Sequence, residues 1–280
     1  MGVVVKRPPR KESCVLAATF HDPDAALLAD VRRFLPRLAA LYDGIAVATS
    51  PPTAAPVNAL LATAGAYAGT PSTNARGPLY RLALRAALAH APTRVHYLDF
   101  DRALHWLRRA PRELPAVLRA ARRHDVLLLG RTARAHRSHH RALHATETVV
   151  NLLFAERLRA RGRVDFLVPS FVLPVPAVRR LLARSRARAA RGYGEWAALL
   201  AGADARLAYL ECDGLDWETP DRAPRVAKGT WRRRLDTPVE WRARTEMAAE
   251  IIEGFTRTLR RHPAQPVLVR VARRACASGR

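Results

Sequence analysis

The sequence has few of the residues and long apolar runs on which several kinds of protein depend. Its three cysteines, Cys14, Cys212 and Cys276, match neither zinc-ligand spacing nor a disulfide framework. A reducing, cytoplasmic setting is therefore expected. No apolar run is long enough to cross a bilayer. The short valine run at residues 3–5 precedes the basic residues, which is the reverse of the order in a secretory signal.

The chain also lacks the local motifs of three common α/β enzyme classes. No Gly-X-Gly-X-X-Gly follows the first expected strand, which argues against a dinucleotide-binding protein. No Walker-type phosphate loop is present, and no Gly-X-Ser-X-Gly elbow marks a serine hydrolase. A nucleotidyltransferase on a similar sheet usually needs a glycine-rich loop after its first strand. Residues 19–23, Thr-Phe-His-Asp-Pro, do not form one.

Lysine is scarce, although the chain is strongly basic. Lysine and arginine total 48 against 24 acidic residues, for a net charge of +24, yet three of the 48 are lysines. The arginines are dispersed among leucines and alanines, as in proteins from GC-rich genomes, and do not form one stripe. We therefore expect no specific nucleic-acid partner, although the charge favours phosphate-bearing ligands and lipid headgroups.

Apolar runs and amphipathic segments alternate along the chain, which predicts an α/β fold with a mostly parallel, nucleotide-binding sheet flanked by helices. The predicted strands are 13–20, 44–50, a weak one near Tyr67, 94–99, 126–131 and 205–211. Residues 164–173 contain Pro169 and predict an edge or irregular strand. Residues 192–194, Gly-Tyr-Gly, predict a loop before a helix at 195–200.

The same reading divides the chain into three parts. Residues 1–12 form a basic N-terminal tail, and residues 13–226 form the main domain. Residues 227–280 form a C-terminal helical extension, which contains the longest predicted helix, Val239–Arg261. In such α/β folds, ligands bind at the carboxyl ends of the strands.

Two carboxylates, Asp99 and Asp101, end one of the predicted strands, Arg94–Asp99. If the extended conformation continues, both side chains point to the same side, because side chains alternate along a strand. Two such carboxylates at a strand end can share a divalent cation that holds a diphosphate. The alternative is that Asp101 caps the next helix while Asp99 is solvated.

The order of these segments resembles the A-type nucleotide-sugar glycosyltransferases, and more narrowly the mannosylglycerate synthase and family-two-like group. The resemblance covers roughly residues 13–255. It rests first on two strand ends, Ala17-Ala18-Thr19-Phe20 and Ala48-Thr49-Ser50. A basic helix start, Asn74-Ala75-Arg76-Gly77, follows with the Ala-Leu segment Leu82-Ala83-Leu84. The last element is a strand that ends in Asp-X-Asp, Tyr97-Leu98-Asp99-Phe100-Asp101.

The resemblance implies a role for each matching residue. It implies donor contacts at Thr19, Phe20, Ser50, Arg76, Arg81 and Asp99, acceptor contacts at Ser170, Phe171 and Trp196, and Glu195 as the catalytic, acceptor-side acid. It implies that Asp99 and Asp101 bind the metal. The late loop, which often supplies a third ligand from a histidine, has no histidine here, so the third ligand is Asp216 or Asp213, or the protein supplies none. Pro169 and Ser170 replace the glycines usual in the acceptor strand. The alternative for Glu195 is an acid that complements a helix dipole.

The implied activity is transfer of a hexose from a nucleotide-diphosphate sugar to a hydroxyl acceptor, aided by Mg²⁺ or Mn²⁺. The acceptor is a small molecule, a saccharide or a lipid-linked hydroxyl, and the expected location is the cytoplasm or the inner face of the membrane. His136, His139, His140 and His144 are interpreted as a solvated basic segment beside this site. The alternative function is a non-catalytic basic protein, a degenerate transferase that contacts RNA or an anionic membrane.

Overall fold

The computed structural model describes residues 12–160, 162–201, 207–217, 219–222, 236–262 and 270–271. The predicted tail at 1–12 therefore lies outside the description except for Glu12, as does much of the predicted 227–280 extension. Within the described ranges, no helix combines the length and the apolar composition needed to cross a bilayer.

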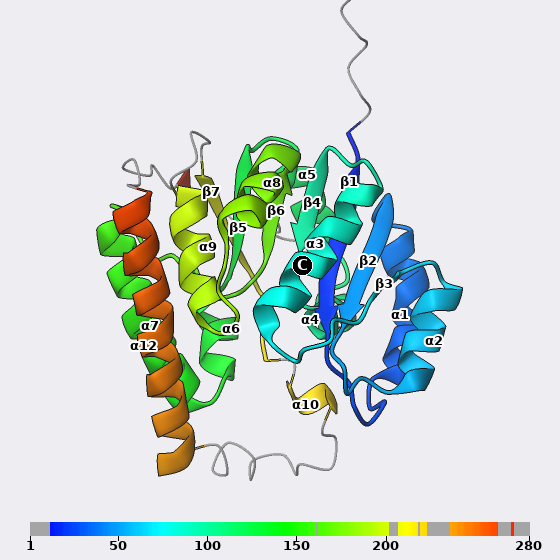
Figure 1. Ribbon diagram of the computed structural model, residues 1–280, viewed down its shortest axis with the longest axis horizontal. Helices are drawn as coiled ribbons and strands as arrows, with labels where there is room; N and C mark the ends of the chain where they lie inside the picture. The colour runs from blue at the N-terminus through cyan, green and yellow to red at the C-terminus, as the bar shows by residue number, and fades with distance from the viewer. Residues whose placement is uncertain are drawn as a thin grey trace, which may run out of the picture.

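The strands form one mixed, mainly parallel sheet, so the predicted α/β fold with a mostly parallel sheet is confirmed (Figure 1). The strand order is β3-β2-β1-β4-β6-β5-β7-β8, and β6 alone among these runs antiparallel to its neighbours, β4 and β5. The bounds are β1 Cys14–Phe20, β2 Gly44–Thr49, β3 Tyr67–Gly69, β4 Arg94–Tyr97, β5 Val126–Arg131, β6 Phe171–Pro174, β7 Leu207–Cys212 and β8 Arg270–Val271.

Helices cover both faces of the sheet (Figure 1). One face carries α1 Leu28–Ala39, α2 Ala55–Thr63, α4 Phe100–Arg109 and α5 Glu113–Ala121. The other carries α3 Arg76–Ala89, α7 Arg141–Arg157, α8 Val175–Arg184, α9 Arg191–Ala201 and α12 Pro238–Arg261. Two short helices, α6 Ala133–Ser138 and α10 Thr219–Arg222, lie in the connections after β5 and β7.

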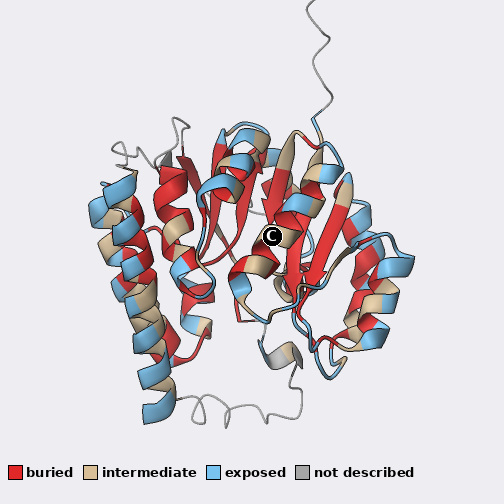
Figure 2. Cartoon of the chain, viewed as in Figure 1, coloured by how far each residue is buried: buried red, intermediate tan, exposed pale blue. Residues whose placement is uncertain are grey.

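The central strands are apolar on both sides because each face packs against helices. In β5, Val126 and Leu128 join one core cluster, whereas Leu127 and Leu129 join the other. Burial on both faces explains why the sequence of β5 reads as a continuous apolar run without alternation. Figure 2 shows the same pattern, with buried strands between helices whose outer surfaces are exposed.

The strand order places a topological switch point between β1 and β4. From β1 the chain adds β2 and β3 on one side, and then returns to place β4 on the other side of β1. At such a point the connections after adjacent strands diverge and leave a crevice at the carboxyl ends. Thr19 and Asp99 lie at the carboxyl ends of these two strands.

The predicted continuation of the strand through Asp99 is wrong. Strand β4 ends at Tyr97, Asp99 is the N-cap residue of α4, and Asp101 lies in the first turn of that helix. The Leu98 amide still donates to Ala17 O on β1, and the helix then begins, because the Ala103 amide donates to Asp99 O. The two carboxylates therefore do not alternate along one strand, and their proximity comes from the turn into α4.

For residues 164–173, the predicted irregular backbone is confirmed in part, whereas the predicted edge position is wrong. Of residues 164–173, the structure makes Phe171–Leu173 part of β6, which lies inside the sheet between β4 and β5 and not at an edge. The preceding residues are irregular, and the Ser170 amide donates locally to Val168 O. Pro169 precedes the ladder, so the missing amide hydrogen costs no strand pairing.

The loop predicted at residues 192–194 is wrong as well, because both glycines lie inside α9. A Cβ on Gly194 would lie 2.0 Å from Ile251 O of α12, and a Cβ on Gly254 would lie 2.3 Å from Arg191 O of α9. Gly194 and Gly254 therefore permit close contact between two helix backbones, and the Gly-Tyr-Gly sequence does not mark a turn. This crossing also seats α12 on the same core as residues 13–226, where Phe255 stacks on Phe154 at 4.0 Å between ring centroids.

We expect Gly194→Ala to lower the free energy of unfolding by about 3 kcal/mol, since the added methyl group meets main-chain atoms that cannot move aside. Gly192→Ala is the matched control, because its Cβ would meet Ala187 Cβ at an ordinary 3.8 Å. The control should be neutral or stabilising, because alanine favours helix. Urea unfolding of both variants tests this, and equal stability of the two would contradict the close-crossing explanation.

Candidate functional site

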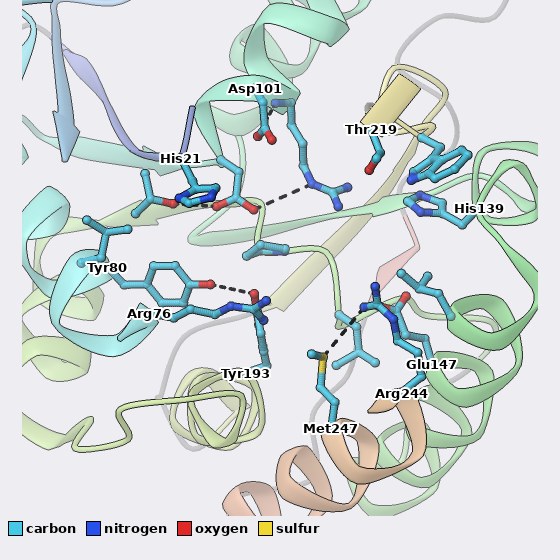
Figure 3. Close-up of a pocket in the computed structure, with 18 of the residues that line it drawn as sticks. His21, Arg76, Tyr80, Asp101, His139, Glu147, Tyr193, Thr219, Arg244 and Met247 are labelled. Atoms are coloured by element: carbon cyan, nitrogen blue, oxygen red, sulfur yellow. Dashed lines mark hydrogen bonds and ion pairs between the residues drawn. The ribbon is translucent and has the colours of Figure 1, made fainter. Parts of the chain in front are cut away.

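A cavity of about 550 Å³ opens at the carboxyl ends of β1, β2 and β4, at the switch point of the sheet. The ends of β1 and β2 and the start of α3 line one side together with Tyr193 of α9, and residues from α7 and α12 line the other together with His139. Figure 3 shows His21, Arg76 and Tyr80 on one side, and His139 and Glu147 across the cavity from them. A cavity of this size and polarity can hold an organic ligand with charged groups.

Most of the predicted donor-side residues lie together in this cavity. The predicted residues that line it are Thr19, Phe20, Ser50, Arg76, Asp99 and Asp101. They come from strand ends and from the starts of α3 and α4, which the parallel topology brings to one edge of the sheet. His21, which the prediction did not include, also lines the cavity, and its Nδ1 lies 2.7 Å from Ser50 Oγ.

Asp99 is fixed by its neighbours on β1 and β4. Thr19 Oγ1 donates to Asp99 Oδ1 at 2.8 Å, and the Tyr97 hydroxyl lies 3.5 Å from the same oxygen. The other oxygen, Oδ2, lies 3.9 Å from Arg102 Nε. Burial and the nearby Asp101 raise the pKa of Asp99, while Arg102, Thr19 and Arg76 act in the opposite direction. The net effect is a raised pKa, and another cation near Asp99 would lower it.

Arg76 provides a permanent positive charge on the same side of the cavity. It is the first residue of α3, so the partial positive charge of the helix N-terminus adds to its own charge. Tyr193 raises the pKa of Arg76, as do Tyr80 and Asp99, and together they outweigh the effect of burial. The Tyr80 and Tyr193 hydroxyls lie 2.6 Å apart and link α3 to α9 (Figure 3).

Glu195, predicted as the acceptor-side acid, does not line this cavity. Its Oε2 accepts hydrogen bonds from Ser185 Oγ and from the amides of Arg186 and Ala187, at 2.9–3.0 Å. The carboxylate thus closes the turn between α8 and α9. Arg81 likewise lies outside the cavity and donates to Ala187 O at 3.1 Å.

The predicted acceptor residues also lie outside the cavity. Ser170 is fully buried, with its Oγ 3.2 Å from His96 Nε2, and Phe171 is buried in β6. Trp196 packs edge-on against Tyr97 at 5.1 Å between centroids, and its Nε1 donates to Ser185 Oγ. These residues support the cavity from behind. Leu167 and Pro169, from the irregular segment before β6, are among the residues that line it.

Asp216, predicted as a third metal ligand, has other partners. Asp216 Oδ1 lies 2.7 Å from His105 Nε2, and Arg134 Nη1 lies 3.2 Å from Oδ2. Asp213, the other candidate, accepts from Thr132 Oγ1 and Arg134 Nε. Neither lines the cavity. In the described part of the chain, no group of three or more histidine, cysteine, aspartate or glutamate side chains is arranged to hold a metal ion.

The histidine cluster borders the cavity as predicted, but its prediction as a solvated segment is wrong. His136, His139 and His140 are each at most 4% exposed. Both ring nitrogens of His139 are buried and have no hydrogen-bond partner among the described residues, and the ring lies 6.3 Å from that of Trp217. Burial and Arg131 hold the pKa of His139 well below its usual value, so the imidazole is neutral at pH 7.

Glu147 is a cavity carboxylate to which the sequence analysis assigned no role. It projects from α7 and pairs with the buried Arg131 at the end of β5. Arg131 Nε also donates to Asp165 Oδ2 at 2.6 Å, and Asn151 Nδ2 donates to Asp165 Oδ1 at 2.9 Å. Burial opposes ionisation of Glu147, but Arg131 outweighs it and lowers the pKa of Glu147. This network fixes α7 against the sheet beneath the cavity.

Comparison of the sequence with protein-family models and with curated proteins finds no match. The functional argument therefore rests on the residues that line the cavity and on their geometry.

We expect the stability of the protein to fall between about pH 6.5 and pH 9 because of His105. Burial lowers the pKa of His105, but the hydrogen bonds that His105 donates to Asp216 and Asp221 outweigh burial and raise it to about 9. Because the folded-state pKa exceeds the unfolded value of about 6.5, the contribution is complete below that pH and disappears as the pH rises through 9.

The test compares unfolding free energies of the wild type and His105→Gln across this pH range, with exposed His90→Gln as the control. The variant should lack a pH-dependent contribution of the order of 2 kcal/mol. Parallel profiles for the wild type and His105→Gln would show that His105 is not charged in the folded protein.

Proposed function

We propose that the protein is a glycosyltransferase with the A-type fold, which moves a hexose from a nucleotide-diphosphate sugar to a hydroxyl acceptor with the aid of a divalent cation. The observation that carries the proposal is the cavity at the switch point of the sheet, where Asp99 and Asp101 lie beside Arg76. The irregular segment before β6, from which Leu167 and Pro169 line the cavity, supports an acceptor side next to these residues. Helices bury both faces of the sheet, so a ligand can bind at the edge formed by the carboxyl ends of the strands.

The charges around Asp99 fit a diphosphate ligand together with a cation. Asp99 and Asp101 are balanced by Arg76 and Arg102, which line the same cavity. A donor diphosphate adds about two negative charges, which a divalent cation would balance. Asp99 and Asp101 are the residues that would hold Mg²⁺ or Mn²⁺, and the bound ion would stabilise the charge that develops on the leaving diphosphate.

In this proposal, side chains on the donor side of the cavity bind the parts of the nucleotide sugar that the cation does not contact. Arg76, at the start of α3, binds phosphate oxygens through its planar guanidinium. Thr19 orients Asp99 through the 2.8 Å hydrogen bond, and the adjacent Phe20 lines the cavity. His21, at the end of β1, and Ser50, at the end of β2, present a polar pair for the nucleoside.

The acceptor occupies the opposite side, where apolar and aromatic surfaces meet a few polar groups. Trp217, Leu143 and Met247 line this side together with His139. His139 contributes a neutral imidazole to this side, and its two buried nitrogens have no partner in the described protein. In this proposal these residues contact the acceptor, a role that the sequence analysis assigned to Trp196 and Glu195.

We expect the double variant Asp99→Asn/Asp101→Asn to lose Mn²⁺-dependent binding of nucleotide-diphosphate sugars and Mn²⁺-dependent hydrolysis of the donor. Both carboxylate charges that hold the cation are removed while the side-chain volumes are kept. Thermal unfolding with a panel of UDP- and GDP-sugars, with Mn²⁺ and with EDTA, measures the binding. Asp24→Asn, at an exposed position outside the cavity, is the control.

Unchanged metal-dependent binding or hydrolysis in the double variant would overturn the proposed cation site. If no nucleotide sugar stabilises the wild-type protein, but an RNA homopolymer or anionic vesicles bind it in a salt-sensitive manner, the non-catalytic alternative is favoured.

A further inference from the structure

A second cavity, of about 390 Å³, is lined by α12, the start of α9 and the connection between α8 and α9, residues 185–190. It lies on the face of the sheet that also carries α3 (Figure 1), and it shares no lining residue with the cavity at the strand ends. We call it the arginine cavity, because it is lined by Arg186, Arg188, Arg191, Arg257 and Arg261. The fold thus gathers arginines that are dispersed in the sequence.

The carboxylates of the arginine cavity do not balance its arginines. Three glutamates line it against the five arginines. Glu195 accepts the hydrogen bonds that close the turn between α8 and α9. Glu253 lies 2.8 Å from Arg191 Nη2 and 3.8 Å from Arg257 Nη2, so two arginines share one carboxylate. With Glu250 as the third acid, the lining keeps an excess of positive charge.

Two arginines of this cavity, Arg188 and Arg261, form no ion pair with any side chain that the structure describes. Like charges also meet beside the cavity. Burial lowers the pKa of Arg81 on α3, and the charges of Arg85 and Arg188 lower it further. Such repulsion destabilises a folded chain, and a bound anion would offset it. The unbalanced charge therefore points to an anionic ligand.

Hydrogen bonds hold the connection that carries two of these arginines in one conformation. Glu195 Oε2 accepts from the amides of Arg186 and Ala187, each at 3.0 Å. The Gly77 amide on α3 donates to Arg188 O at 3.0 Å, and a Cβ on Gly77 would lie 1.9 Å from Ala187 O. The backbone that presents Arg186 and Arg188 is thus fixed from two sides, which reduces the ordering cost of binding a ligand.

We propose that the arginine cavity binds a compact anion with two or more phosphate groups, such as a polyphosphate or a phosphorylated lipid headgroup. Guanidinium groups bind phosphate oxygens in pairs. The arginines come from the α8–α9 connection and from α12, so two phosphate groups can be bound at once. A nucleic acid, by contrast, is bound through phosphates along an extended strand. The site is separate from the nucleotide-sugar cavity and does not depend on the proposed function.

The test is calorimetric titration of the full chain with sodium tripolyphosphate, in buffer freed of divalent cations. We expect Arg188→Gln and Arg261→Gln each to bind tripolyphosphate about tenfold more weakly than the wild type, which corresponds to one charge-assisted contact. Arg119→Gln is the matched control, because it removes the same charge from an exposed position of α5 on the other face of the sheet. The control should bind like the wild type.

Co-sedimentation with phosphatidylcholine vesicles, with and without cardiolipin, distinguishes two sources of the phosphate groups. Loss of cardiolipin-dependent sedimentation in both variants, without tripolyphosphate binding, identifies a lipid headgroup. Weakened tripolyphosphate binding without vesicle binding identifies a soluble anion. Either result supports the proposal. Thermal unfolding without ligand checks that the variants are folded, and Arg188→Gln should be at least as stable as the wild type, because it removes an unpaired charge from among like charges.

Equal binding of each probe by the wild type, both variants and the control would overturn the proposal. Binding of neither probe, or of an RNA homopolymer alone, would overturn it as well. Because the proposed nucleotide-sugar site needs a divalent cation and the titration contains none, all of these outcomes leave the proposed function standing.

Discussion

The carboxylate of Asp99 is held between groups that shift its protonation in opposite directions, and the candidate site depends on this balance. Burial and Asp101 raise its pKa, whereas Arg102, Thr19 and Arg76 favour the ionised form. These groups come from β1, α3 and α4, which meet because the chain reverses its direction of strand addition at β1. The sheet topology thus places the carboxylates of Asp99 and Asp101 close to Arg76, Arg102 and the hydroxyl group of Thr19.

The opposite side of the cavity depends on how closely the last long helix packs. Gly194 and Gly254 let α9 and α12 touch backbone to backbone, and this crossing brings Met247 of α12 to the cavity. Beneath α7, the charge of Arg131 is almost fully buried but is matched by Asp165 and Glu147. A buried arginine with two carboxylate partners avoids the large cost of an unpaired charge and fixes α7, the helix that follows the cavity histidines His139 and His140.

The sequence predicted the sheet and most of the strand-end residues that line one side of the cavity, because both follow from local patterns and parallel topology. Apolar runs such as Val126–Arg131 are strands buried on both faces, and residues at consecutive strand ends must meet at one edge. The residues across the cavity were not predicted, since their contacts join distant segments. Asp216 binds His105 across 111 residues, and Glu195 closes a turn that no local pattern marks as needing a carboxylate. Gly194 permits a close helix crossing, whereas the sequence Gly-Tyr-Gly at 192–194 looks like a turn.

The most direct measurement is anomalous diffraction from crystals grown with Mn²⁺ and the nucleoside diphosphate that stabilises the protein most. A manganese peak in contact with the carboxylates of Asp99 and Asp101 and with the diphosphate, with the nucleoside towards Ser50, is the result that the proposed function predicts. A manganese ion bound elsewhere, or a nucleotide outside the cavity at the ends of β1 and β4, would contradict it.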